Sequence, residues 1–231
     1  MIEERDSQTE RARGQVYEFF SALLLNPPAA EMLARALDED GVKAWEAIFP
    51  DQPACARLRE LSRAYRRGEW QAEDFLFDYE ALFRVPGNSY VHPFESVYCH
   101  ESFSRGKMKG CTVLAEQARD VGAIYRKHGL SPREGFTELP DHLGVELELM
   151  AVLCRKTAEA LQEGNRRKAA CLASEQRAFL SDHLLRWGPL CLRKIRVKAG
   201  TPFYLCLAEL LEAFLEEEDN LNSYLFKSAS G

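Results

Sequence analysis

The chain of 231 residues has no long apolar run and little glycine or proline. No uninterrupted apolar stretch approaches the roughly 18 residues that a membrane-spanning helix needs. The N-terminal residues 1–6 are charged and lack the apolar core of a secretory signal. Glycine and proline, 14 and 10 residues, are too few for a β-sandwich with many tight turns. We therefore expect a cytoplasmic protein that does not insert directly into membranes.

The seven cysteines do not form a recognisable metal or disulfide pattern. No C-x-x-C pair occurs, so the spacings of zinc ribbons and ferredoxins are absent. The number is odd, and the chain is far longer than small secreted proteins that depend on disulfides. We expect free thiols that pack as small apolar side chains, as Cys154 and Cys206 would on helices.

The sequence also lacks a strong positive charge and the common catalytic motifs. Its net charge is −6, from 36 acidic and 30 basic residues, which disfavours binding to a nucleic-acid backbone. The patterns G-x-G-x-x-G, G-x-x-x-x-G-K-[ST], G-x-S-x-G and H-E-x-x-H do not occur. These absences predict that the protein is not an enzyme and that nucleic acid is not its partner.

What the sequence has in abundance is helical periodicity. Apolar residues recur at three- and four-residue spacing, whereas no stretch alternates with period two. The expected helical segments are 16–24, 32–37, 42–49, 58–65, 75–83, 113–125, 139–154, 166–187 and 201–226. The predicted fold class is all-α, a single compact bundle of about nine or ten helices over residues 1–231. An alternative division has subdomains 1–83 and 107–231.

Residues 84–106 interrupt the helical pattern and would join those two subdomains. Prolines, glycines and serines alternate there with the aromatic residues Tyr90, Phe94, Tyr98 and Phe103. A loop of this length is uncommon in a compact domain unless it carries a function. We therefore predict a functional loop over this segment, and a second, shorter break over residues 129–139.

Candidate functional groups gather near the second break. His142 and Glu146 are one helical turn apart and would supply two metal ligands, where zinc requires at least three. A capping or recognition pair is therefore favoured. Pro140 and Asp141 are typical of a helix start, and the acidic run 216–219 is expected to be a solvated face. The alternative function is a metal- or Fe–S-handling assembly protein that uses His92, His100, His142 and the cysteines.

Three blocks of sequence, taken together, resemble a known family. The first consists of residues 79–83, Tyr-Glu-Ala-Leu-Phe, and 93–98, Pro-Phe-Glu-Ser-Val-Tyr. The second is Leu-Pro-Asp-His-Leu-Gly-Val-Glu at 139–146, and the third combines His183 and Trp187 with an aromatic and leucine-rich helix after residue 202. The chain resembles the TorD/DmsD/NarJ-like chaperones, redox enzyme maturation proteins that assist the assembly of molybdenum-containing enzymes.

The resemblance implies an all-helical cytoplasmic chaperone. Such a protein would bind the twin-arginine signal peptide of a molybdopterin-containing oxidoreductase catalytic subunit, and would delay its export until the cofactor is inserted. It would need no cofactor, with weak binding of guanine nucleotides as a further implication. The resemblance leaves open whether the chain is a monomer or a domain-swapped dimer, and it does not identify the client enzyme.

The resemblance and the residue chemistry together define a predicted peptide site. Aromatic and leucine side chains would accept the apolar peptide core, and carboxylates would pair with its arginines. Tyr79 departs from many relatives, which carry tryptophan there. We also expect that alanine at Asp141 or His142 weakens peptide binding without unfolding the chain. The predicted site residues are Tyr79, Leu82, Phe83, Pro86, Pro93, Phe94, Glu95, Ser96, Tyr98, Pro140, Asp141, His142 and Glu146.

Overall fold

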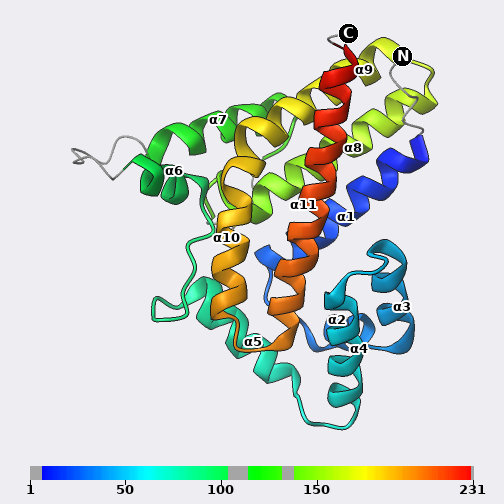
Figure 1. The fold of residues 1–231 in the computed structure, drawn as a ribbon. Coiled ribbons are helices and arrows are strands. Elements are labelled where there is room, and N and C mark those ends of the chain that lie inside the picture. Colours follow the sequence, from blue (N-terminus) through cyan, green and yellow to red (C-terminus); the bar gives the residue numbers. More distant parts are fainter. Residues whose placement is uncertain (1–6, 104–113, 132–137, 230–231) are drawn as a thin grey trace. The chain divides into compact units, whose positions relative to one another are not determined.

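The computed structural model describes residues 7–103, 114–131 and 138–229, and these are helical with no β-strand among them (Figure 1). The helices are α1 (Ser7–Leu25), α2 (Ala30–Ala36), α3 (Glu39–Ile48), α4 (Pro53–Arg66), α5 (Ala72–Tyr79), α6 (Glu95–Phe103), α7 (Leu114–Lys127), α8 (Leu143–Gln162), α9 (Arg166–Phe179), α10 (Leu185–Lys198) and α11 (Pro202–Ala229). Two π-helical turns, η1 (Glu80–Arg84) and η2 (Leu180–Leu184), extend α5 and join α9 to α10. The described residues therefore form ten continuous helical segments, which confirms the all-α prediction.

The chain divides into two compact units, each discontinuous in sequence. The first unit comprises Met1–Leu25, Pro93–Gly188 and Glu217–Gly231. The second unit comprises Asn26–His92 and Pro189–Glu216. This division differs from the subdomains 1–83 and 107–231 considered above. The physical reason is that α1 packs along α8, so these two helices, far apart in sequence, belong to the same unit.

Small residues allow α1 and α8 to approach closely in the first unit. A Cβ atom at Gly14 would lie 3.3 Å from both the Ala151 carbonyl oxygen and the Cys154 Cβ. At the other end of the contact, the Ser21 hydroxyl donates a hydrogen bond of 2.7 Å to the Gly144 carbonyl. The pair forms the most extensive helix–helix contact in the described residues. Close packing of this kind makes the interface sensitive to added volume.

A buried ion network joins α1 to α9 and α11 in the first unit. The Arg13 guanidinium donates to Glu218 Oε1 at 2.7 Å, to Glu10 Oε1 at 2.8 Å and to Gln176 Oε1 at 2.9 Å. The Tyr17 hydroxyl also donates to Glu218, at 2.8 Å. The prediction that the acidic run 216–219 is a solvated face is therefore wrong for Glu218, because this carboxylate neutralises a buried arginine.

The second unit has an aromatic core and a buried aspartate that binds the backbone just before α11. Tyr79 and Phe83 contact one another with ring centroids 5.3 Å apart, and both contact Tyr204, at 6.3 and 5.9 Å. Asp78 accepts hydrogen bonds from the backbone N–H groups of Gly200 and Thr201, at 2.9 and 2.8 Å. These donors belong to the two residues that precede α11, so a side chain of α5 fixes the turn that leads into a distant helix.

Two of the differences from the expected helix boundaries follow from tertiary contacts. The predicted loop 84–106 contains helix α6, because an aspartate from elsewhere in the chain caps its first turn, as described below. The helix predicted to end at Trp187 continues through Pro189 to Lys198. A proline inside a helix costs about 3 kcal/mol, but Cys191, Leu192 and Ile195 beyond it are fully buried. Burial of this stripe outweighs the local cost.

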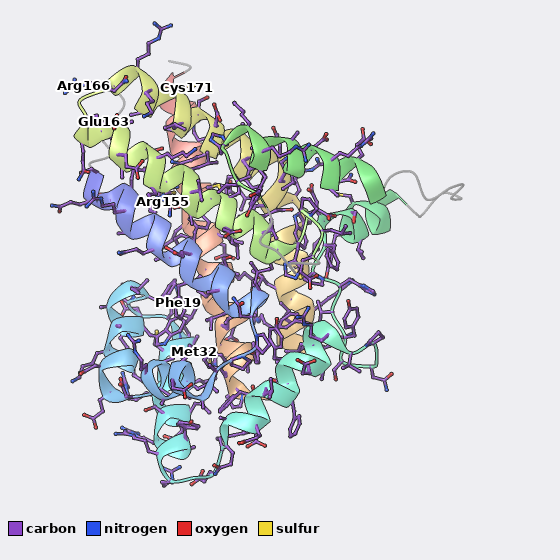
Figure 2. The ribbon with its side chains drawn as sticks, turned by 180° about the vertical axis from the view of Figure 1, so that it is seen from behind. Phe19, Met32, Arg155, Glu163, Arg166 and Cys171 are labelled. Atoms are coloured by element: carbon purple, nitrogen blue, oxygen red, sulfur yellow. The ribbon has the colours of Figure 1, made fainter. Side chains whose placement is uncertain are left out.

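Buried packing is confirmed for four thiols, including Cys154 and Cys206. All six cysteines of the described residues are free, and four of them are buried. Cys171 is exposed on α9 (Figure 2), and Cys99 is half-buried. Cys111 lies outside the described residues. No helix in the described part of the chain is long and apolar enough to cross a membrane.

The close α1–α8 contact predicts that Gly14→Val destabilises the protein. The added methyl groups would meet backbone and Cβ atoms of α8, and we expect the free energy of unfolding in urea to fall by about 2 kcal/mol. Gly87→Val is the matched control, because this glycine is exposed and a Cβ atom there would come no closer than 3.9 Å, to the Val85 carbonyl oxygen. The control should stay within about 0.5 kcal/mol of the natural protein. Equal effects of the two changes would contradict the packing argument.

Candidate functional site

Two of the predicted motifs, far apart in sequence, meet in the first unit. The Leu143 N–H donates to the Pro93 carbonyl at 2.8 Å, and the Glu95 N–H donates to the Asp141 carbonyl at 2.9 Å. Between these bonds, Phe94 and His142 form an isolated antiparallel bridge. Residues 93–96 and 140–143 thus lie antiparallel, and we call this pairing the motif junction. It connects the chain segments that lead into α6 and α8.

Side chains of the motif junction cap both helices. Asp141 Oδ2 accepts from the Ser96 N–H at 3.1 Å, in the first turn of α6. His142 is the N-cap of α8, where its Nδ1 accepts from the Gly144 N–H at 3.0 Å. An acceptor nitrogen carries no proton, so a neutral His142 ring holds its hydrogen on Nε2. The expected helix start at residues 140–141 is therefore present, although Asp141 caps α6 and His142 caps α8.

Three carboxylates that belong to the junction and to the first turn of α8 are buried together. Glu95, Asp141 and Glu146 each expose 1 % or less of their surface, and we call them the carboxylate cluster. His183 Nδ1 lies 2.8 Å from Glu95 Oε2. The Trp187 indole N–H lies 3.1 and 3.2 Å from the two Glu146 oxygens. Among the described residues, His183 is therefore the basic side chain that contacts these three acids.

The electrostatics of the carboxylate cluster favour a proton on Glu146. Burial raises the pKa of the Glu146 carboxyl well above its usual range, and the charge of Glu95 raises it further. The hydrogen bond from Trp187 lowers this pKa, while the charge of Asp141 raises it. A positively charged group bound beside these three carboxylates would offset the repulsion among them.

Two atoms of the junction are buried without a hydrogen-bond partner among the described residues. They are Asp141 Oδ1 and Ser96 Oγ. An unsatisfied buried carboxylate oxygen costs on the order of 1–3 kcal/mol or more. The junction therefore has unused hydrogen-bonding capacity, which a donor such as a guanidinium group would satisfy.

His183 and Trp187 are site residues that the sequence analysis did not assign to the site. They lie at and just after the π turn η2. The ring of His183 stacks on Phe179 with centroids 4.9 Å apart, and Trp187 packs against Tyr98 at 5.4 Å. The third sequence block contained both residues. The π turn gave no sequence signal of its own, although such turns are frequent at functional sites.

The remaining predicted site residues divide between the two units. Tyr79, Leu82 and Phe83 are buried in the core of the second unit, where Pro86 is exposed. In the first unit, Phe94 and Pro140 are half-buried, whereas Pro93, Ser96 and Tyr98 are buried. The aromatic residues of the first motif pack as core in this conformation, so their contact with a peptide stays a prediction.

The groups considered for a metal site are not gathered into one. In the described residues, no three histidine, cysteine, aspartate or glutamate side chains are arranged to hold a metal ion. His92 belongs to the second unit and His142 to the first, and the His142 Nδ1 is already an acceptor for Gly144. The side chain of His100 lies outside the described part of the chain.

Comparison with protein-family models identifies residues 50–193 as a match to the nitrate reductase delta subunit family. The chain belongs to this family. The matched region contains the whole motif junction and the carboxylate cluster, together with His183 and Trp187. The site described here therefore lies within the part of the chain that the family defines.

Relatives in this family are named as chaperones. The chain is 32 % identical over 228 residues to the chaperone protein TorD of Aeromonas salmonicida, with 96 % of each chain covered. It is 30 % identical to the TorD of Photobacterium profundum, over 60 % of this chain and 59 % of that protein. It is 35 % identical to a perchlorate reductase assembly chaperone protein of Dechloromonas aromatica, over 65 % of this chain and 63 % of that protein. The family assigns a chaperone role, not an enzymatic one.

The capping geometry predicts that Asp141→Ala destabilises the protein, contrary to the sequence expectation of a nearly unchanged melt. Loss of the α6 cap should lower the free energy of unfolding by about 1–2 kcal/mol. Asp141→Asn keeps an acceptor oxygen and should lose less. Urea denaturation of both variants checks this order. Equal stability of Asp141→Ala and the natural protein would contradict the capping role.

Burial of Glu146 predicts a pH-dependent effect of Glu146→Gln. A raised pKa in the folded state means that ionisation of Glu146 opposes folding. The stability that protonated Glu146 contributes is therefore complete below pH 4.5 or so, and is lost as the pH rises above about 4.5 toward the folded pKa. Glutamine removes the effect, and the variant should gain on the natural protein by about 1.4 kcal/mol for each pH unit until the folded pKa is reached.

Urea denaturation between pH 5 and pH 8 measures this difference. The exposed Glu159→Gln, also on α8, is the matched control and should show a small difference at every pH. A difference between Glu146→Gln and the natural protein that stays constant from pH 5 to pH 8 would contradict the account.

Proposed function

We propose that this chaperone binds the N-terminal signal peptide of a molybdenum-cofactor oxidoreductase, and that the carboxylate cluster receives the arginines of that peptide. The observation that carries the proposal is the cluster itself. Three carboxylates are buried together at the motif junction, and Asp141 Oδ1 has no hydrogen-bond partner among the described residues. Buried acids with perturbed ionisation are characteristic of functional sites.

Guanidinium is the cation that suits this cluster. Its planar fork carries five N–H donors and pairs with carboxylates through two parallel hydrogen bonds. It is also less strongly hydrated than an ammonium ion, which lowers the cost of bringing it into a buried site. The net charge of −6 would favour the approach of a basic peptide over a neutral one.

Half-buried apolar side chains beside the cluster would contact the apolar part of the peptide. Phe94 lies within the junction, with its ring 5.3 Å from that of His142. Leu139 precedes Pro140 and leaves 49 % of its surface exposed. We expect the helix-forming core of a signal peptide to pack on these residues after its arginines have bound.

The biological consequence follows from what the peptide does. A signal peptide held by the chaperone is not available to the export machinery, so the precursor stays in the cytoplasm while its cofactor is inserted. The name of the Dechloromonas relative, an assembly chaperone of perchlorate reductase, supports a redox-enzyme client. The proposed binding needs no cofactor, and titration with GTP tests the weak guanine-nucleotide binding implied by the family resemblance.

Isothermal titration with a synthetic peptide tests the proposal. The peptide carries two adjacent arginines followed by an apolar helix-forming stretch, and we expect a Kd of 0.1 mM or tighter, about −5.5 kcal/mol. Glu95→Gln and Asp141→Asn should each weaken binding about tenfold, because each removes one negative charge from the cluster. A peptide with two glutamines in place of the arginines should bind no better to the natural protein than to these variants.

Asp78→Asn provides the matched control. Asp78 is also a buried aspartate that accepts a hydrogen bond from a backbone N–H group beside a helix start, but it lies in the second unit. This variant should lose stability and keep its affinity for the peptide. If the arginine peptide does not bind the natural protein, or if Asp78→Asn weakens binding as much as Asp141→Asn, the proposal is wrong.

A further inference from the structure

The carboxylate cluster is closed in this structure. Asp141 and Glu146 have no exposed surface, and Glu95 exposes 1 %. A peptide arginine reaches these oxygens only after some covering element has moved. Besides η2 and α10, which hydrogen-bond to the cluster itself, helix α7 packs on both segments that bear it, since it lies beside α6 (Figure 1) and contacts Pro140, the residue before Asp141.

The contact between α7 and the motif junction is made at a glycine. A Cβ atom at Gly122 would lie 3.4 Å from Pro140 Cγ and 3.6 Å from Pro140 Cβ. A glycine inside a helix costs about 1 kcal/mol relative to alanine, and here it lets the α7 backbone lie directly on Pro140. The flat contact has no side chain of residue 122 to interlock with the junction.

Hydrogen bonds hold the C-terminal end of α7 in place. Tyr125 donates its hydroxyl to Glu148 Oε2 at 2.6 Å, and the His128 Nε2 lies 2.9 Å from Glu175 Oε2. Lys156 of α8 donates to the His128 carbonyl at 2.7 Å. All three contacts lie at or just beyond the C-terminal turn of α7, so they fix that end of the helix onto α8 and α9.

Apolar burial along α7 is small in comparison. Among residues 116–127, whose side chains the structure describes, Val121 is the fully buried apolar side chain. By contrast, α8 buries an apolar residue in every turn from Leu143 to Ala160. Elements with few buried apolar contacts open at lower free energy than the core. Helix α7 therefore has an anchored end, a weakly held body and a flat contact over the junction.

We propose that α7 is a movable cover of the carboxylate cluster, which opens about its anchored C-terminal end to admit the guanidinium groups of the client peptide. The inference rests on the proposed function for the identity of the ligand. The proposed movement itself involves only α7, Pro140 and the carboxylate cluster, whatever the ligand is. Peptide affinity would then be reduced by the free energy needed to open α7.

A reversible crosslink between α7 and the junction tests the cover. The 3.6 Å separation between the two Cβ positions matches the spacing in disulfides, so Gly122→Cys with Pro140→Cys should form one on oxidation. The exposed Cys171 is changed to serine in all forms, and each single cysteine variant serves as a control. Intact mass and peptide mapping confirm the bond.

Two measurements are made on the oxidised and the reduced double variant. The first is titration with the twin-arginine peptide. The second needs no peptide: it is hydrogen exchange of the Trp187 indole N–H, which faces Glu146 in the cluster and is assigned through Trp187→Phe. Oxidation should weaken peptide binding and slow indole exchange, each by about tenfold, and reduction should restore both.

The outcomes separate the cover from the proposed function. If the oxidised form binds peptide and exchanges as the reduced form does, α7 is not the cover, although binding by both forms would uphold the proposed function. If the natural protein does not bind the peptide but oxidation still slows indole exchange, the cover stands and the proposed ligand is wrong. If oxidant changes peptide binding and indole exchange in the single cysteine variants as it does in the double variant, the proposal that α7 is the cover is also wrong.

Discussion

The antiparallel pairing of residues 93–96 with 140–143 is the constraint on which the first unit depends. One short junction starts two helices, because Asp141 caps α6 and His142 caps α8. The same pairing buries Glu95, Asp141 and Glu146 in one place. From α8 the contact extends to α1 through Gly14 and Gly144. Changes at the junction therefore affect both the helix starts and the acids at their ends.

Burying three carboxylates together is costly unless something offsets their charge. One buried ion pair with good geometry rarely improves stability over apolar packing, and here a histidine is the basic partner that the structure places at Glu95. The contrast with Arg13 is informative, because that guanidinium is already enclosed by Glu10 and Glu218. Among the described residues, the first unit thus holds one satisfied arginine–carboxylate network and one set of carboxylates with no arginine hydrogen-bonded to it. The second set is where we place the client's arginines.

Sequence reasoning predicted most helices because apolar spacing reports helices directly. It missed α6, since the cap that starts this helix comes from Asp141, 45 residues away. It ended the helical segment 166–187 at Trp187, whereas tertiary burial of Ile195 and its neighbours carries the helix onward. The motifs grouped Asp141 and His142 with Glu95 in one predicted site, and the structure brings these residues together at the junction. Their burial, and the roles of His183 and Trp187, depend on long-range packing and on a π turn that no local pattern predicts.

The most direct test is an NMR titration of the full chain with the twin-arginine peptide. The account predicts saturable chemical-shift changes at the Ser96 amide, which bonds Asp141, and at the Trp187 indole, which faces Glu146. It predicts no comparable change at the Thr201 amide, which bonds Asp78 in the second unit. Shifts confined to Thr201 and its neighbours, with Ser96 and Trp187 unchanged at saturation, would contradict it.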